Sequence, residues 1–186
     1  MKKISVSVYL LLIGLLCTVP VSGLIQDDLE KYLSREDYNN SVSLNNGNYL
    51  LLWYIEQDEL YMAMLGKTTG WVAIGFNPGD MMMDADIVMA GLVDDTPYWS
   101  DSFSTGPFGP HPADTTLGGM DNILNLTVLE NDGWTIVEFS RKLDTGDEYD
   151  ALIIPGDDMT VMWAMGRDDN MEIKHPSAKG KTIISF

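Results

Sequence analysis

Three consecutive methionines, Met81, Met82 and Met83, stand in the stretch "GWVAIGFNPGDMMMDADIVMAG" at residues 70–91. Methionine is apolar and flexible and therefore suits protein cores. In an exposed loop it packs poorly and is open to oxidation. The flanking segments are typical of strands, so the triplet falls in a loop. Either this loop folds inward, or one of its thioether sulfurs has a partner.

The two histidines of the chain are His111 and His175. His111 lies between prolines in "GPHPAD", which predicts an exposed turn, and His175 lies in "MEIKHPSAKGK", just before the last predicted strand. A lone loop histidine is usually an ordinary polar residue. Together with a methionine, however, a histidine can hold haem iron without any cysteine. The two ligands must then meet across an apolar pocket, and loops at one end of a β-sandwich can bring them there.

Two pairs of acidic residues are weaker candidates for a metal-binding site. Asp84 and Asp86 in "DADIV", with Asp94 and Asp95 in "VDD", could give oxygen ligands to calcium. Their spacing does not match an EF-hand loop, and a solvated acidic edge is the simpler interpretation. The chain has no nucleophile elbow, P-loop, H-E-x-x-H or dinucleotide-binding motif, so catalysis is unsupported.

Five tryptophans lie mostly in predicted strands, which indicates a core role. Trp99 and Phe103 differ, because they lie at the beginning of the long loop predicted by "DSFSTGPFGPHPADTTLGGMDN", a segment rich in Gly, Pro, Ser and Asp. These two rings could line a ligand pocket.

The elements that must position these residues are strands. "YLLLWYIEQ" and "ELYMAMLG" predict a hairpin turning at Gln57–Asp58, and "GWVAIGFN" is apolar on both faces, as expected of a buried central strand. Asp132-Gly133 is a strong signal for a second hairpin. At least seven short strands with no long amphipathic helix predict an all-β sandwich.

The first residues are typical of an export signal. "MKK" precedes a long apolar run that ends in small residues, which predicts a signal peptide at residues 1–23 and an extracytoplasmic protein. An uncleaved anchor is the minority alternative. The single cysteine, Cys17, falls in this run, so the mature chain has no disulfide. We expect a polar linker or short helix at 24–44, one domain at 45–186, and no membrane span after the signal.

The net charge of the chain is −17. Such a chain repels nucleic acid and anionic membranes, and it suits a basic partner, cations or simply high solubility.

In the order and spacing of its motifs, the chain resembles the DOMON domain family, which includes regions of dopamine beta-monooxygenase and of cellobiose dehydrogenase. The matching segments are "GWVAIGFNP", "MMMDADIVMAG", "YWSDSFSTGPFGPHPADTTLGGMDNI", "GWTIVEFSRKLDTGD" and "VMWAMGRDDNMEIKHPSAKGKTIISF". The resemblance implies an immunoglobulin-like sandwich of about ten antiparallel strands that binds haem b or, in some members, sugars.

The resemblance also implies a ligand pair. In haem-binding members, a methionine before "x-x-A-D" and a histidine before the last strand hold the iron, and here they correspond to Met82 and His175. Met81 and Met83 would then line the pocket. The family's loop often has glycine where this chain has Asp84. Many members are fused to a membrane cytochrome, whereas here the redox partner would be a separate protein.

Three hypotheses follow. The leading one is an exported, non-catalytic haem b domain that passes single electrons through Met82/His175-ligated iron. The second is a cell-envelope module that binds a sugar or another small molecule in the same pocket without haem. The third is a plain structural or adhesive module. A visible absorption spectrum separates the first hypothesis from the other two.

Overall fold

The computed structural model describes residues 29, 31–34, 38–171 and 178–186. The predicted signal peptide and His175 lie outside these residues. Within the described part of the chain, no helix is long and apolar enough to cross a membrane.

Ten strands and two short helical segments make up the described fold. The strands are β1 (Asn40–Leu44), β2 (Tyr49–Glu56), β3 (Glu59–Gly66), β4 (Val72–Phe76), β5 (Asp86–Val93), β6 (Thr96–Phe103), β7 (Leu124–Asn131), β8 (Trp134–Lys142), β9 (Asp158–Met165) and β10 (Lys179–Ser185). A 3-10 turn, Asn45–Gly47, follows β1, and the four-residue helix α2 is Asp114–Leu117.

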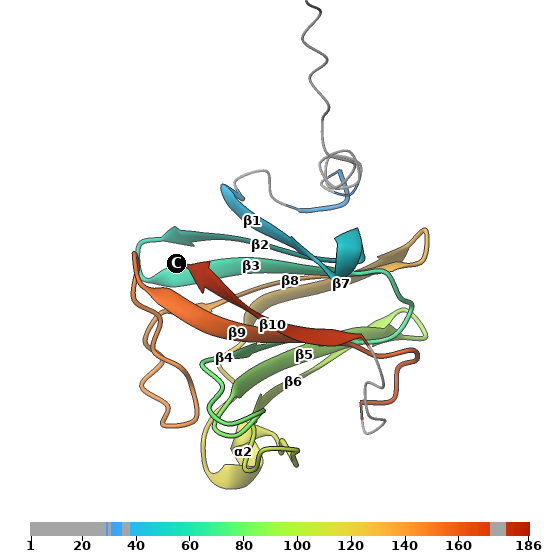
Figure 1. The fold of residues 1–186 in the computed structure, drawn as a ribbon. Helices are drawn as coiled ribbons and strands as arrows, with labels where there is room; N and C mark the ends of the chain where they lie inside the picture. The colour runs from blue at the N-terminus through green and yellow to red at the C-terminus, as the bar shows by residue number, and fades with distance from the viewer. Residues whose placement is uncertain (1–28, 30, 35–37, 172–177) are drawn as a thin grey trace, which may run out of the picture.

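The strands form two antiparallel five-stranded sheets that face each other (Figure 1). The first sheet has the order β1-β2-β3-β8-β7 and the second the order β10-β9-β4-β5-β6. The predicted all-β sandwich is therefore confirmed. The apolar segment "GWVAIGFN" contributes β4, every residue of which is buried, at the centre of the second sheet, as predicted.

The main core fills the space between the sheets. Leu51, Met62 and Val137 from the first sheet pack with Ile74 and Val88 from the second, and all five are fully buried. The outer faces are apolar as well. On the first sheet, Leu29 joins a cluster with residues of β2, β3 and β8, and on the second sheet Trp71, Ala73 and Met89 form a smaller cluster. Because both faces of the central strands are apolar, these strands appear in the sequence as continuous hydrophobic runs.

Both predicted hairpin turns are present. β2 pairs with β3 across Gln57–Asp58, and β7 pairs with β8 across Asp132–Gly133. Asp132 and Gly133 have φ of 51° and 75°, the left-handed values that two-residue hairpins of this kind require.

Two segments differ from the sequence-based expectation. The range 24–44, predicted as a linker or short helix, contains β1, which pairs with β2, so the first sheet begins five residues before the predicted domain. The predicted long loop begins at Asp101, whereas residues 101–103 are the end of β6, a strand that starts with Thr96 and Pro97. β6 is at the edge of its sheet, where a proline costs no ladder hydrogen bond.

Candidate functional site

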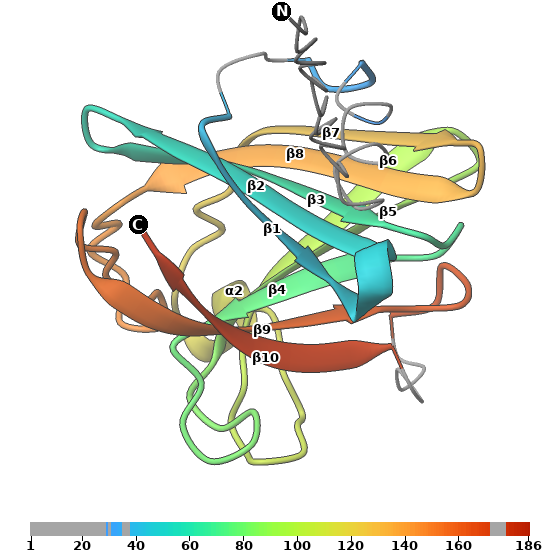
Figure 2. The same cartoon turned by 45° about the horizontal axis from the view of Figure 1, so that its top comes forward.

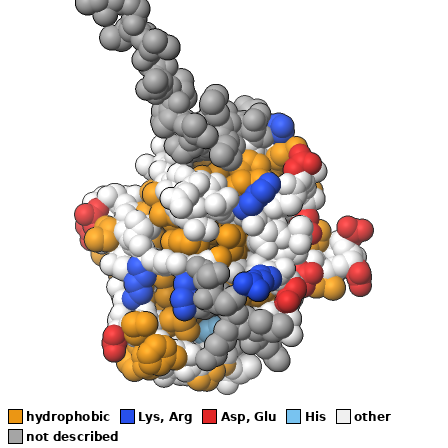
Figure 3. All heavy atoms as spheres, turned by 45° about the vertical axis from the view of Figure 1, so that its right-hand side comes forward, with side chains coloured by type: hydrophobic (Ala, Val, Ile, Leu, Met, Phe, Trp, Pro, Cys, Tyr) orange, Lys and Arg blue, Asp and Glu red, His pale blue; other side chains and the backbone are white. Residues whose placement is uncertain are grey.

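A cavity of about 430 Å³ opens on the outer face of the second sheet. Its volume is in the usual range of ligand pockets, about 300–1,000 Å³. The lining is mostly apolar and includes Trp71, Met81, Met82, Met89, Phe108 and His111. Figure 3 shows hydrophobic side chains exposed on this side of the molecule. A histidine side chain and several Lys or Arg side chains lie close to them.

The floor of the cavity is set by strand register. Side chains on one face of a sheet line up across paired strands, because successive residues of a strand point to opposite faces. One row joins Lys179, Ala164, Ala73 and Met89, and the next row joins Lys181, Met162, Gly75 and Ile87. In the middle strands, β9 and β4, the side chains of Ala164, Ala73 and Gly75 are small, and Met162 is the one long side chain among these four positions. This pattern leaves a shallow apolar trough.

The methionine triplet lies in the β4–β5 loop, at one end of the trough. Backbone hydrogen bonds close this loop on itself, from Gly79 N–H to Met83 O at 2.8 Å and from Ala85 N–H to Met82 O at 3.1 Å. Asp84 has a φ of 59°, in the left-handed region that favours glycine and that aspartate tolerates better than most residues. Asp84 therefore adopts the conformation that glycine would supply at this position.

Two of the three methionines reach the cavity. Met81 and Met82 line it, whereas Met83 is not among the lining residues. Met81 is 50% exposed, and Met82 is half-buried. The backbone N–H of Met82 donates to Pro107 O at 3.2 Å, and its carbonyl accepts from Ala85. Of the two lining methionines, Met82 thus has its backbone held on both sides.

A second loop, residues 104–112, lies beside the methionine loop (Figure 2). Asp84 N–H donates to Ser104 O at 2.9 Å, which ties the two loops together. This loop brings Pro107, Phe108 and His111 to the cavity. His111 was predicted to occupy an exposed turn. It is instead half-buried in the cavity lining, because the loop folds back over the sheet.

The opposite edge of the cavity is formed by β10. Lys179 and Lys181 line it, and Lys181 Nζ donates to Gly79 O at 3.5 Å. Our sequence reasoning missed these lysines, although their alternation in "KGKTIISF" signals two cations on one face of a strand. His175 lies outside the described residues. The chain on either side of it borders the cavity region, since Met171 packs against the Trp71 cluster and Lys179 lines the cavity.

Trp99 and Phe103 are placed elsewhere by β6. Trp99 is 45% exposed and donates from its indole nitrogen to Asp121 at 2.8 Å. Phe103 packs edge-on against Tyr149, with ring centroids 5.4 Å apart. Neither ring is among the residues that line the cavity.

Comparison with known proteins decides the family. The family model for the DOMON domain matches residues 45–166. The chain belongs to the DOMON family. The resemblance inferred from the sequence motifs is therefore confirmed over most of the sandwich.

Two relatives of this DOMON chain are named as monooxygenases. The chain is 33% identical over 136 residues to mouse DBH-like monooxygenase protein 1 and 29% identical over 125 residues to the human protein. These alignments cover 71% and 67% of the chain, but only 21% and 19% of the relatives. The chain thus spans about a fifth of the length of these relatives.

Solved cytochrome domains share the DOMON fold of this chain. The cytochrome b domain of Coprinopsis cinerea pyranose dehydrogenase superposes with a TM-score of 0.57 at 14% identity, covering 77% of this chain and 80% of that one. The cytochrome domain of Myriococcum thermophilum cellobiose dehydrogenase gives the same TM-score and coverage at 13% identity. At this identity, the likeness shows a shared fold.

Proposed function

We propose that this DOMON domain binds one haem b in the cavity and passes single electrons, with Met82 and His175 as axial ligands. The observation that carries the proposal is the position of Met81 and Met82 in an apolar cavity on a fold shared with cytochrome domains. Methionine and histidine together are a known haem ligand pair.

The residues of the cavity fit such a group. A porphyrin is flat and apolar, and the trough has Ala73, Gly75 and Ala164 in its floor. A Cβ added to Gly75 would lie 2.7 Å from Met162 Cε, so the glycine keeps this part of the floor low. Lys179 and Lys181 could pair with the two carboxylates that haem b carries.

Met82 is the preferred sulfur ligand. Its backbone is held by hydrogen bonds on both sides, whereas Met81 is half exposed. His175 is proposed as the second ligand from the family resemblance, and the described residues nearest to it in sequence are Met171, which packs on the outer face of the sheet, and Ala178, whose carbonyl accepts from Met165 N–H at 3.0 Å.

When bound, haem supplies one-electron oxidation and reduction. The protein supplies the remaining conditions for electron transfer. With Met82 and His175 both bound to it, the iron would have no open site for substrate, and the methionine would raise the reduction potential relative to two histidine ligands. The apolar lining excludes water. We propose an extracytoplasmic location and a separate redox protein as the partner, and the acidic surface favours a partner with a basic docking face.

The direct test is a haem titration of the purified chain, followed by visible spectroscopy of the oxidised and reduced forms. We expect one haem per chain and a low-spin, six-coordinate spectrum. Met82→Leu should convert this spectrum to that of a five-coordinate or water-ligated form, and His175→Ala should do the same or abolish binding.

Two neighbours serve as matched controls. Met83→Leu and His111→Ala should leave the spectrum six-coordinate, because Met83 does not line the cavity and His111 shares the wall of Met82. A loss of the spectrum in His111→Ala alone would reassign the histidine ligand. If the chain takes up no haem, the proposal is wrong. The second hypothesis, that the cavity binds a small molecule without haem, would then be favoured.

A further inference from the structure

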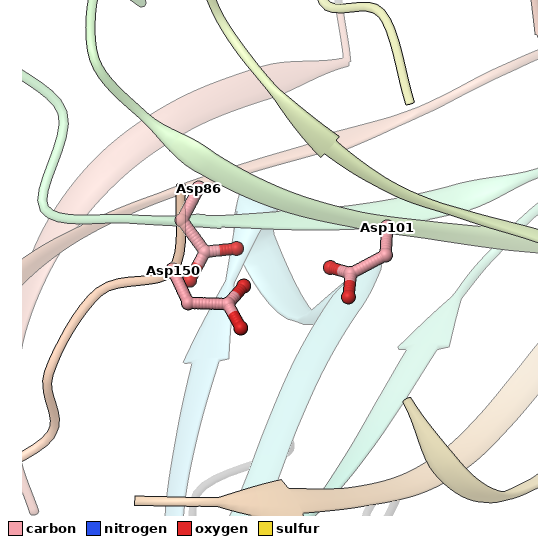
Figure 4. A group of neighbouring side chains, drawn as sticks. All are labelled: Asp86, Asp101 and Asp150. Atoms are coloured by element: carbon pink, nitrogen blue, oxygen red, sulfur yellow. The ribbon is translucent and has the colours of Figure 1, made fainter. Parts of the chain in front are cut away.

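A second cluster of chemically active side chains is buried at the other edge of the second sheet. Asp86 begins β5, Asp101 is in β6, and Asp150 is in the connection between β8 and β9. One carboxylate oxygen from each lies within 4.8 Å of those of the other two. Figure 4 shows the three carboxylates pointing toward one another.

These side chains are almost completely buried. Asp86 is 1% exposed, Asp101 is 4% exposed, and the side chain of Asp150 is 2% exposed. Asp114, from α2, is fully buried as well and interacts electrostatically with Asp150 and Asp86. Burying an ionised carboxylate is costly unless it is paired and hydrogen-bonded.

Only some of the carboxylate oxygens in this cluster accept hydrogen bonds. Asp86 Oδ2 accepts from Arg141 at 2.6 Å and from Ala151 N–H at 2.8 Å, and Asp101 Oδ2 accepts from Asn122 N–H at 2.8 Å. In the described part of the chain, the buried Oδ1 atoms of Asp86 and Asp101 have no hydrogen-bond partner. The same holds for both carboxylate oxygens of Asp150 and for the amide oxygen of Asn122.

The charges do not balance either. Arg141 contacts Asp86, and it reaches Asp150 at 3.5 Å. One guanidinium therefore faces three carboxylates, and Asp114 is a fourth acid nearby. Unpartnered acceptor oxygens together with excess negative charge describe a site for a cation.

We propose that Asp86, Asp101 and Asp150 bind one Ca²⁺ ion, with the Asn122 amide oxygen available as a further ligand. Every candidate donor is a hard oxygen atom, which disfavours Zn²⁺ and copper. Oxygens no more than 4.8 Å apart can surround one ion at about the 2.3–2.6 Å of a Ca²⁺–oxygen bond. Mg²⁺ fits less well, because it usually keeps several waters and these three carboxylates are almost completely buried.

This site differs from the calcium alternative drawn from the sequence. Asp84, Asp94 and Asp95 are exposed, so of the acids considered there only Asp86 takes part. The ion would join β5, β6 and the β8–β9 connection. Because Asp86 directly follows the methionine loop, the ion would also fix the end of that loop.

The test uses the haem-free chain, so its outcome is independent of the proposed electron transfer. The chain is stripped with EDTA, dialysed against buffered Ca²⁺, and assayed for bound metal by mass spectrometry. We expect one Ca²⁺ per chain at saturation and a thermal midpoint that rises with Ca²⁺ concentration and is reversed by EDTA. Mg²⁺ at equal concentration should give a smaller rise.

Variants locate the ion. Asp101→Asn should lower the Ca²⁺ stoichiometry to near zero and abolish the shift of the midpoint, while the EDTA-treated variant folds at least as well as wild type. Asp94→Asn, an exposed acid on the β5–β6 turn, should bind Ca²⁺ like wild type. If wild type binds no Ca²⁺ at millimolar concentration and EDTA leaves its midpoint unchanged, protons alone neutralise the cluster and the proposal is wrong.

Discussion

At the residue scale, Arg141 shows how one side chain can organise several others. It is fully buried, reaches from β8 of the first sheet to Asp86 of the second, and also donates to Ala151 O at 3.3 Å. Its guanidinium lies 5.5 Å from the ring centroid of Phe76. A buried ion pair adds little net stability over apolar packing, but removing one partner leaves an uncompensated charge.

Arg141→Met tests this role. In EDTA at pH 7, we expect the variant to lose about 3–5 kcal/mol of unfolding free energy, because Asp86 and Asp150 lose their counter-charge. Denaturant unfolding measures the loss. Lys142→Met, at the exposed next position of β8, should change the stability by less than about 0.5 kcal/mol. Equal losses in both variants would mean that the charge of Arg141 is not what stabilises the fold.

At the scale of elements, the two faces of the second sheet have different roles. The inner face of β4 packs in the sandwich core, and the outer face forms the floor of the cavity. The same alternation continues through β5 and β9, so the trough is a property of three aligned strands. Two loops then cover one end of it, and their mutual hydrogen bonds fix the position of Met82.

Gly75→Ala tests the shape of the floor and rests on the proposed haem site. The new Cβ would lie 2.7–2.8 Å from the Met162 side chain and would push it into the cavity. Overpacking of this kind costs about 1–3 kcal/mol, so haem affinity should fall by about tenfold or more. The measurement is a haem titration monitored at the Soret band.

Gly91→Ala is the matched control for the floor. Gly91 is on the same face of β5 as the lining residues Ile87 and Met89, but it lies against Tyr98 and does not itself line the cavity. The control should lose stability and keep its haem affinity. If the two variants bind haem equally well, the floor at Gly75 does not contact the ligand.

At the scale of the whole molecule, negative charge is both on the surface and inside. The chain carries 28 acidic and 11 basic side chains, and part of the excess is buried beside Arg141. Burial, together with the charges of nearby Asp150 and Asp86, raises the pKa of Asp101 to about 8 in spite of the hydrogen bond from Asn122. Burial likewise raises the pKa of Asp86.

These shifts predict how the stability of the cation-free chain depends on pH. The ordinary pKa of Asp101 is 3.8, so between about pH 4 and pH 8 the folded chain keeps a proton that the unfolded chain releases. Stability should therefore fall as pH rises through this range. Thermal midpoints in EDTA should be lower at pH 8 than at pH 5, and Asp101→Asn should flatten the slope. A wild-type midpoint that rises from pH 5 to pH 8 would contradict the burial of an ionisable Asp101.

The sequence by itself determined the class of fold, the family and the two hairpins. Period-two alternation, continuous apolar runs and the Asp132-Gly133 turn are local signals, because they depend on side-chain direction and backbone preference within a few residues. β6 escaped detection because its edge position, which makes Pro97 acceptable, is a relation between strands and has no local signature.

Only the tertiary structure determined which residues come together in the cavity and in the aspartate cluster. Strand register places Ala73, Gly75 and Ala164 together in the floor of one trough. The folding of the loops places His111 in the cavity wall, whereas Met83 does not line the cavity. Asp86 and Asp101 meet because β5 and β6 pair, while Asp150 arrives from a distant connection. Contacts between residues far apart in sequence depend on how whole strands align, and no short pattern encodes that alignment.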